Sequence, residues 1–151
     1  MTKGKEYSYI VDGKLEIPFK YSAGKFESKF LTTLRDEKKI LAVKCNKCKK
    51  IFLPPRRYCT YCYADLNGKW VEVQDEGKVV NFTIVRYSEP YQPAKPPYVI
   101  AQIKLKGADT SMLHVLGEVD PKKVRAGMKV KAAWSDERKA NMFDIKYFKP
   151  I

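Results

Sequence analysis

The sequence predicts a mainly β protein in three parts: an N-terminal hairpin and helix, a metal-bound ribbon and a five-stranded barrel. All four cysteines fall in two C-x-x-C pairs, ten residues apart, within "CNKCKKIFLPPRRYCTYC". From residue 70 onward, apolar residues recur at every second position in short runs bounded by Gly, Pro or Asp, a pattern typical of antiparallel strands. We expect the three parts at residues 1–40, 41–68 and 69–151.

Length and charge bound the function. The 151 residues suffice for one ordinary domain, or for a small β domain with a metal-bound appendage. Thirty Lys and Arg against 17 Asp and Glu give a formal net charge of +13, which four zinc-bound thiolates and the metal would bring to about +11. This excess favours nucleic acid, a phosphate-bearing cofactor such as coenzyme A, or an acidic protein surface as the partner.

The N-terminal sequence indicates no targeting or membrane segment. No run approaches 18 apolar residues, and "MTKGKEYSYIVDGK" has neither an apolar core nor a small-residue cleavage site. We therefore expect a cytoplasmic protein without a membrane partner.

The predicted zinc ligands are Cys45, Cys48, Cys59 and Cys62. In a reducing cytosol each C-x-x-C pair offers two thiolates from one tight turn, and two turns complete a tetrahedral shell. Four sulfurs leave no position for water or substrate, so the metal would be structural. Disulfides, a redox dithiol and iron stay open as alternatives. Lys49 and Tyr63 follow the two pairs, where such turns often use Gly at positive φ.

The first 40 residues predict a hairpin and an amphipathic helix. Residues 7–17 alternate apolar and polar around a two-residue turn at 12–13. Ser22 or Gly24 can begin the helix. The residues at helical spacing are Phe26, Phe30, Leu31 and Leu34. This apolar stripe packs either on its own domain or, together with the hairpin, on a partner. A short strand is expected at 40–43.

Five runs of residues predict the strands of the barrel. Four have these apolar faces: Val80, Phe82 and Ile84; Val99, Ala101, Ile103 and Leu105; Met128, Val130, Ala132 and Trp134; and Phe143, Ile145 and Tyr147. The fifth run is "MLHVLGEV". This pattern fits a Greek-key barrel of the oligomer-binding (OB) kind, with an SH3-like barrel as the main competitor. The Pro- and Tyr-rich loop from Ser88 to Tyr98 either lies across a partner or ligand or is a rigid connection.

Catalytic candidates are few. His114 is the one histidine of the chain and lies among apolar neighbours, so we expect it to have a structural or surface role. The cysteines are assigned to zinc, and the sequence contains neither a G-x-S-x-G elbow nor a Gly-rich phosphate loop. We therefore expect a protein that is not an enzyme.

Two stretches of the sequence carry a family resemblance. They are "LAVKCNKCKKIFLPPRRYCTYC", which includes the Pro54-Pro55-Arg56 step, and the Gly127-Met128-x-Val130 turn of the barrel. On these residues the chain, from about residue 17 to 151, resembles the domain-of-unknown-function-35 family. That family joins a rubredoxin-like zinc ribbon to a C-terminal OB fold. The resemblance implies an accessory or scaffold protein that binds acyl-CoA together with a thiolase-superfamily enzyme, in assemblies like those of acetoacetyl-CoA thiolase and hydroxymethylglutaryl-CoA synthase.

Under this interpretation the candidate ligand contacts are Lys49, Lys50, Arg56, Arg57 and Tyr91. Lys and Arg can pair with the 3′-phosphate and pyrophosphate groups of CoA, although for any single one of them an ordinary solvated charge is the simpler interpretation. The competing hypothesis is a single-stranded nucleic-acid-binding protein whose Phe82, Tyr87 and Trp134 stack on bases. The core-directed faces expected for Phe82 and Trp134 argue against that hypothesis.

Overall fold

One helix, eight strands and two 3₁₀ turns make up the part of the chain that the computed structural model describes, which is residues 11, 13, 15, 17 and 19–151. In order they are α1 (Gly24–Glu37), β1 (Ile40–Lys44), β2 (Ile51–Phe52), β3 (Trp70–Val73), β4 (Glu76–Val85), β5 (Tyr98–Leu105), β6 (Met112–Leu116), η1 (Pro121–Lys123), β7 (Lys129–Trp134), η2 (Met142–Asp144) and β8 (Ile145–Pro150). Most residues of the expected hairpin at 7–17 lie outside the described residues. Among the described residues, no helix is both long and apolar enough to cross a membrane.

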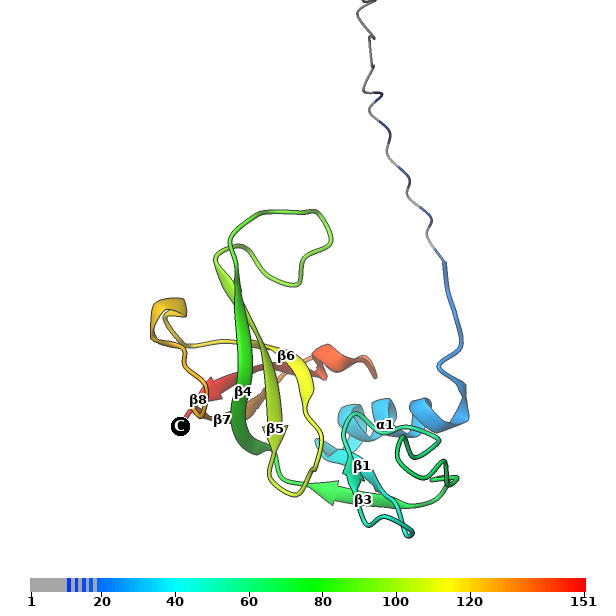
Figure 1. Ribbon diagram of the computed structural model, residues 1–151. Helices are drawn as coiled ribbons and strands as arrows, with labels where there is room; N and C mark the ends of the chain where they lie inside the picture. Colours follow the sequence, from blue (N-terminus) through cyan, green and yellow to red (C-terminus); the bar gives the residue numbers. More distant parts are fainter. Residues whose placement is uncertain (1–10, 12, 14, 16, 18) are drawn as a thin grey trace, which may run out of the picture.

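Five strands close a barrel in the order β4-β5-β6-β8-β7. Neighbouring strands pair antiparallel except for β6 and β8, which are parallel. Figure 1 shows β4 and β5 as the longest strands, joined by a loop that projects from the barrel. The five-stranded OB barrel predicted from the sequence is therefore confirmed.

The strand faces follow the predicted alternation where the pairing is regular. In β5, the side chains of Val99, Ala101, Ile103 and Leu105 are all buried, as predicted. The face predicted for β4 is partly wrong, because a β-bulge between Val79 and Asn81 shifts the register. Val79 is buried and Val80 is exposed, whereas Phe82 and Ile84 pack against the core as expected.

The last strand also differs from its predicted face. Phe143 lies in η2, before the strand begins, and is exposed. Ile145 and Phe148 fill the interior of the barrel, and Tyr147 is only half-buried. The β7–β8 register shifts between Ala133 and Trp134, so simple alternation did not identify the inward side chains.

A second sheet belongs to the ribbon and has the order β2-β1-β3. β3 pairs antiparallel along β1, from Ile40 opposite Val73 to Val43 opposite Trp70. Residues 70–73, which we assigned to the barrel part, thus lie in the ribbon sheet. Period-two alternation indicates a strand but does not say which sheet it joins. The domain boundaries stay a prediction.

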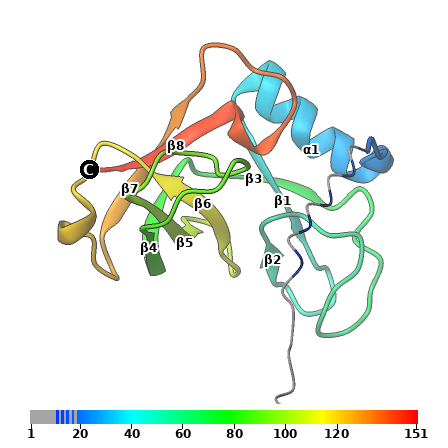
Figure 2. The same cartoon turned by 90° about the horizontal axis from the view of Figure 1, so that it is seen from above.

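The helix forms where the sequence predicts it. Ser22 Oγ accepts the backbone N–H of Gly24 at 3.1 Å, at the start of α1. Phe30 and Leu34 are buried against the common core, and α1 contacts β1 and η2 (Figure 2). Arg138 Nε donates to the carbonyl of Arg35 at 2.6 Å, near the end of the helix. Of the two interpretations of the apolar stripe, packing within its own protein is the one observed.

The ribbon and the barrel share one core. A single buried cluster includes Leu34 of α1, Ala42 of β1 and Ile103 of β5. Two backbone groups of Leu53 add polar contacts across the junction: Leu53 N–H donates to Thr110 Oγ1 at 2.7 Å, and Thr110 Oγ1 donates back to Leu53 C=O at 2.9 Å. The two parts are therefore held in a fixed relation by packing and hydrogen bonds together.

Candidate metal centre and ligand surface

The four cysteine side chains converge at one point of the ribbon. Their Sγ atoms all lie within 4.8 Å of one another, and the Cys45–Cys62 and Cys48–Cys59 pairs are 3.5 Å apart. A tetrahedral shell with metal–sulfur bonds of about 2.3 Å places sulfurs about 3.8 Å apart. The four cysteines are thus positioned to bind one metal ion, and all four are free thiols rather than disulfides. Whether each is a zinc ligand stays a prediction.

Two equivalent backbone turns present these sulfurs. Lys49 N–H donates to Cys45 C=O at 2.8 Å, and Tyr63 N–H donates to Cys59 C=O at 3.0 Å. Lys49 and Tyr63 have φ values of 64° and 57°, so both turns need the left-handed conformation that Gly adopts more easily. A side chain in this region costs about 1–2 kcal/mol, which the ribbon must offset elsewhere.

Backbone N–H groups of the first turn favour the thiolate form of Cys45. Cys48 N–H lies 3.5 Å from Cys45 Sγ. Together with Lys47 N–H, it lowers the pKa of the Cys45 thiol to about 6. A thiolate at neutral pH is the form that binds a metal ion.

A small apolar cluster surrounds the metal centre. It contains Val43, Cys45, Phe52, Cys59 and Leu66, all buried. Phe26 of α1 and Trp70 of β3 pack against it, with ring centroids 4.6 Å apart. The ribbon is too small to have an extensive core of its own, so metal binding and this cluster stabilise it jointly.

The arginines proposed as ligand contacts are partly engaged within the ribbon. Arg57 binds Asp65 through two hydrogen bonds of 2.7 and 2.8 Å, and this guanidinium lowers the pKa of the Asp65 carboxyl. Arg56 stacks over the ring of Phe52 at 5.1 Å. Its Nε is buried and makes no hydrogen bond with the described residues. Arg57 therefore has a structural partner, while Arg56 keeps an unsatisfied donor.

The remaining candidates are not all in one place. Lys50 Nζ lies 3.9 Å from Asp109, and Lys49 is exposed on the first turn. Tyr91 lies on the loop between β4 and β5, at the ends of those strands that point away from the ribbon (Figure 1). The structure thus has four of the five predicted ligand contacts on the ribbon and does not bring Tyr91 to them.

Sequence reasoning missed three tyrosines on the second turn of the ribbon. Tyr58, Tyr61 and Tyr63, which we call the tyrosine group, are 58%, 66% and 83% exposed. The signal was available in "YCTYCY", because side chains that alternate with metal-directed cysteines cannot enter a core as small as this one. Large aromatic side chains held outward by a rigid loop are typical of protein-binding surfaces.

His114 has the structural role expected from the sequence. It is 6% exposed, its Nε2 lies 3.1 Å from Met142 C=O, and its Nδ1 accepts the Val115 N–H at 2.9 Å. Because Nδ1 accepts, the proton of the neutral ring is on Nε2. Burial lowers the pKa of this imidazole.

Comparison with known proteins gives matches to two domain families. Residues 33–67 match the ChsH2 rubredoxin-like zinc ribbon domain, and residues 70–135 match the ChsH2 C-terminal OB-fold domain. Together these matches span about two thirds of the chain. A solved structure described as an Ltp2-ChsH2(DUF35) aldolase shares the fold, with a TM-score of 0.62 and 23% identity over 86% of this chain and 98% of that one.

The chain belongs to the domain-of-unknown-function-35 (DUF35) family. A DUF35 protein of unknown function from Sulfolobus solfataricus has a TM-score of 0.64 and 25% identity over 85% of this chain and 87% of that one. A DUF35 domain-containing scaffold protein from Pyrococcus furiosus is 27% identical over 78% of this chain and 82% of its own length.

One relative is much longer than this DUF35 chain. A probable enoyl-CoA hydratase alpha subunit from Thermomonospora curvata is 26% identical over 65% of this chain. The match spans only 30% of that relative's length. The likeness therefore concerns one part of a larger protein.

Proposed function

We propose that this DUF35 protein is a non-catalytic accessory or scaffold protein that binds acyl-CoA together with a thiolase-type enzyme. The observation that carries the proposal is the tyrosine group, three large and well-exposed aromatic side chains on a loop anchored by the metal centre. The names of the relatives agree with it, since one is a scaffold protein and another forms part of an aldolase assembly. We place the protein in the cytoplasm, where the thiolates of a four-cysteine zinc site are kept reduced.

We assign zinc to the four cysteines, in a structural role. Four sulfur ligands at tetrahedral spacing suit Zn²⁺ and leave no coordination position for a substrate. The bound ion would hold the second turn, and with it the tyrosine group, in a fixed orientation toward a partner. The three parts of the chain that we infer are the N-terminal segment with α1, the ribbon and the barrel.

The acyl-CoA would lie at the junction between the ribbon and the enzyme. Lys49, Lys50 and Arg56 are the contacts that we favour. Arg57 is held by two short hydrogen bonds to Asp65, whereas Lys50 has only a 3.9 Å contact with Asp109. The guanidinium of Arg56 stacks over Phe52 and makes no ion pair with the described residues, so its outer N–H groups could donate to a phosphate oxygen. Because no single contact is strong, we expect the complex with the enzyme, rather than this chain alone, to bind CoA tightly.

The proposal is tested by isolating the native complex from the source cells with this chain as bait. We expect mass spectrometry to identify a thiolase-superfamily enzyme in stoichiometric amount. A bait carrying Tyr61→Ala and Tyr63→Ala should recover at least tenfold less of that enzyme, since exposed aromatic anchors dominate binding at interfaces. The control bait carries Tyr87→Ala, which removes an exposed tyrosine outside the ribbon.

Two outcomes would contradict the proposal. The first is recovery of RNA or ribosomal material without such an enzyme, which would favour the nucleic-acid hypothesis. In that case, affinity would fall steeply and log-linearly with salt, whereas a CoA complex with few phosphates has a shallow salt dependence. The second is equal recovery by the tyrosine variant and its control, which would move the docking surface away from the ribbon.

A further inference from the structure

The outer face of the barrel carries three lysines in direct register. Lys78 of β4 is opposite Lys104 of β5 on one side and opposite Lys129 of β7 on the other. We call these residues the lysine row. Adjacent strands are about 4.8 Å apart, so the Cα atoms of the two outer lysines are separated by about 10 Å. Like charges directly opposite one another on a sheet are destabilising, so this arrangement needs a reason.

In the neighbouring row of the same strands, a carboxylate lies between the lysines and neutralises part of their charge. Glu76 is opposite Lys131 and bonds to it at 3.3 Å, and it also binds Lys106 Nζ at 2.9 Å. The two lysines lower the pKa of Glu76, as expected for a carboxylate between two cations. The central position of the neighbouring row is Glu76, whereas the central position of the lysine row is Lys78. Among the described residues, no carboxylate lies within ion-pair distance of Lys78, Lys104 or Lys129.

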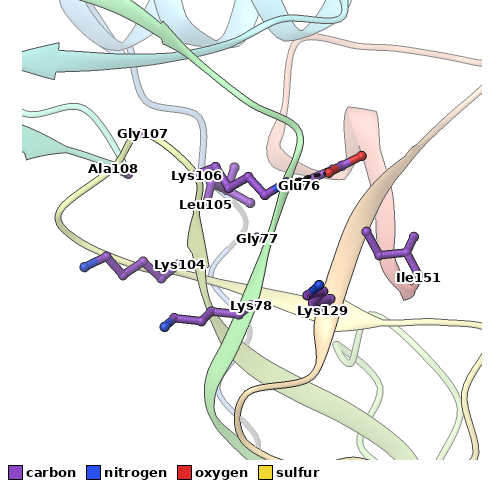
Figure 3. Close-up of a pocket in the computed structure, with 10 residues that line it drawn as sticks. All are labelled: Glu76, Gly77, Lys78, Lys104, Leu105, Lys106, Gly107, Ala108, Lys129 and Ile151. Carbon is purple, nitrogen blue, oxygen red and sulfur yellow. Dashed lines mark hydrogen bonds and ion pairs between the residues drawn. The ribbon is translucent and has the colours of Figure 1, made fainter.

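The lysine row borders a cavity of about 380 Å³. Figure 3 shows the side chains of Lys78 and Lys104 extending in the same direction, with Lys129 on the adjacent strand. Besides the three lysines, Glu76 and Gly77 also line this cavity. This volume is within the range of small-molecule sites and is far below what a folded partner would fill.

The backbones of β4 and β5 approach each other closely next to the lysine row. A Cβ added to Gly77 would lie 2.3 Å from the carbonyl oxygen of Lys104. Only a glycine therefore fits at position 77 of β4, and the pairing register next to it sets Lys78 opposite Lys104. The cost of bringing these charges together is built into the backbone and is not an accident of side-chain conformation.

We propose that the lysine row and its cavity bind a ligand that carries two or more adjacent phosphate groups. Linked phosphates concentrate negative charge over a distance that matches the row, and lysine serves as a point-charge contact for phosphate oxygens. The ligand would replace the carboxylate that the neighbouring row contains. This site is separate from the ribbon and needs no partner enzyme, so it stands or falls independently of the function proposed above.

The test is calorimetric titration of the full-length, zinc-loaded chain with inorganic pyrophosphate and, separately, with tripolyphosphate, in a buffer free of phosphate and sulfate. We expect binding by the native chain and at least a tenfold loss of affinity in Lys78→Gln. The matched control is Lys146→Gln, which removes one charge from an exposed position of β8, outside the row. This control should bind within twofold of the native chain.

Thermal unfolding of the free proteins adds a readout that does not need a ligand. Removing the central charge should raise the melting temperature of Lys78→Gln at low salt, and the gain should shrink as salt screens the row. The proposal is overturned if the native chain binds neither phosphate probe, if Lys78→Gln binds like the control, or if Lys78→Gln melts lower than the native chain. Lys78-dependent binding of a single-stranded oligonucleotide without binding of pyrophosphate would overturn it too.

Discussion

At the scale of single residues, His114 makes the unfolding free energy of the protein depend on pH. The ring is neutral and buried, with both nitrogens hydrogen-bonded, and burial lowers its pKa below the ordinary value of about 6.5. Between 6.5 and the lower folded value, the unfolded chain binds more protons than the folded one. Stability is therefore complete above about pH 6.5 and falls as the pH drops below it.

This sign predicts a difference between the native chain and His114→Gln, which keeps an amide donor for Met142 C=O. Between pH 7.5 and 5.5 the native chain should lose more unfolding free energy than the variant, because burial lowers the pKa of His114 and Gln does not titrate. Chemical denaturation at the two pH values measures the difference. Carboxylates and thiols contribute equally to both proteins, so an identical pH dependence would show that His114 is not the group responsible.

Several single-residue features could be predicted from position alone. Lys49 and Tyr63 have positive φ because each follows a C-x-x-C pair, where the turn geometry requires it. The inward position of Val79 could not be predicted, because alternation counts residues evenly and a bulge adds one. The carboxylate partner of Arg57 was also missed, since Asp65 is eight residues away and only the folded ribbon brings them together.

At the scale of elements, the junction between β2 and the β5–β6 connection deserves a direct test. Thr110→Val removes the hydroxyl that satisfies both backbone groups of Leu53, whose side chain is fully buried. Leaving the Leu53 N–H without a partner should lower the unfolding free energy by about 1–3 kcal/mol. Denaturant titration gives this value, and hydrogen exchange should show faster exchange at the Leu53 amide.

Thr83→Val is the matched control for this prediction, since it makes the same substitution at an exposed position of β4. It should change the unfolding free energy by no more than about 0.5 kcal/mol. Equal effects of the two substitutions would mean that the hydrogen bonds between Thr110 and Leu53 do not stabilise the junction.

The existence and type of most elements were predictable because their apolar periodicity is strong. The helix, the barrel strands and the strand at 40–44 all occur close to the predicted positions. Pairing between distant elements was harder. β3 adds to the ribbon because β1 offers a free edge there, and nothing in the four residues "WVEV" indicates that edge.

At the scale of the whole molecule, the metal centre should support more than the ribbon. The apolar cluster around the cysteines adjoins the common core through β1 and β2, so loss of the metal removes support from both. Chelation of zinc should lower the melting temperature by roughly 10 °C or more, corresponding to several kcal/mol in a chain of this size. Circular dichroism with and without a chelator measures this shift, and added zinc should reverse it.

An unchanged melting temperature after complete removal of zinc, verified by elemental analysis, would contradict a structural role for the metal. Cys45→Ser gives an independent check, since it removes one ligand without a chelator. It should melt at about the temperature of the chelated native chain.

The candidate site was only partly accessible from the sequence. The cysteine spacing is local, so the metal centre could be recognised before any fold was known. The lysine row could not be predicted from the sequence, because its three lysines come from strands whose pairing register is known only from the folded barrel. The spacing of the tyrosine group is evident in the sequence. Whether these side chains are exposed depends on the size of the core beneath them, which the sequence alone does not give.

The most direct test of an accessory role is the turnover of acetoacetyl-CoA and CoA by three samples: this chain alone, the thiolase-superfamily enzyme recovered with it, and the two together. We predict turnover by the enzyme and by the reconstituted complex, and no turnover above the buffer rate by this chain alone. Turnover of acyl-CoA by the purified chain without the enzyme would contradict the accessory role.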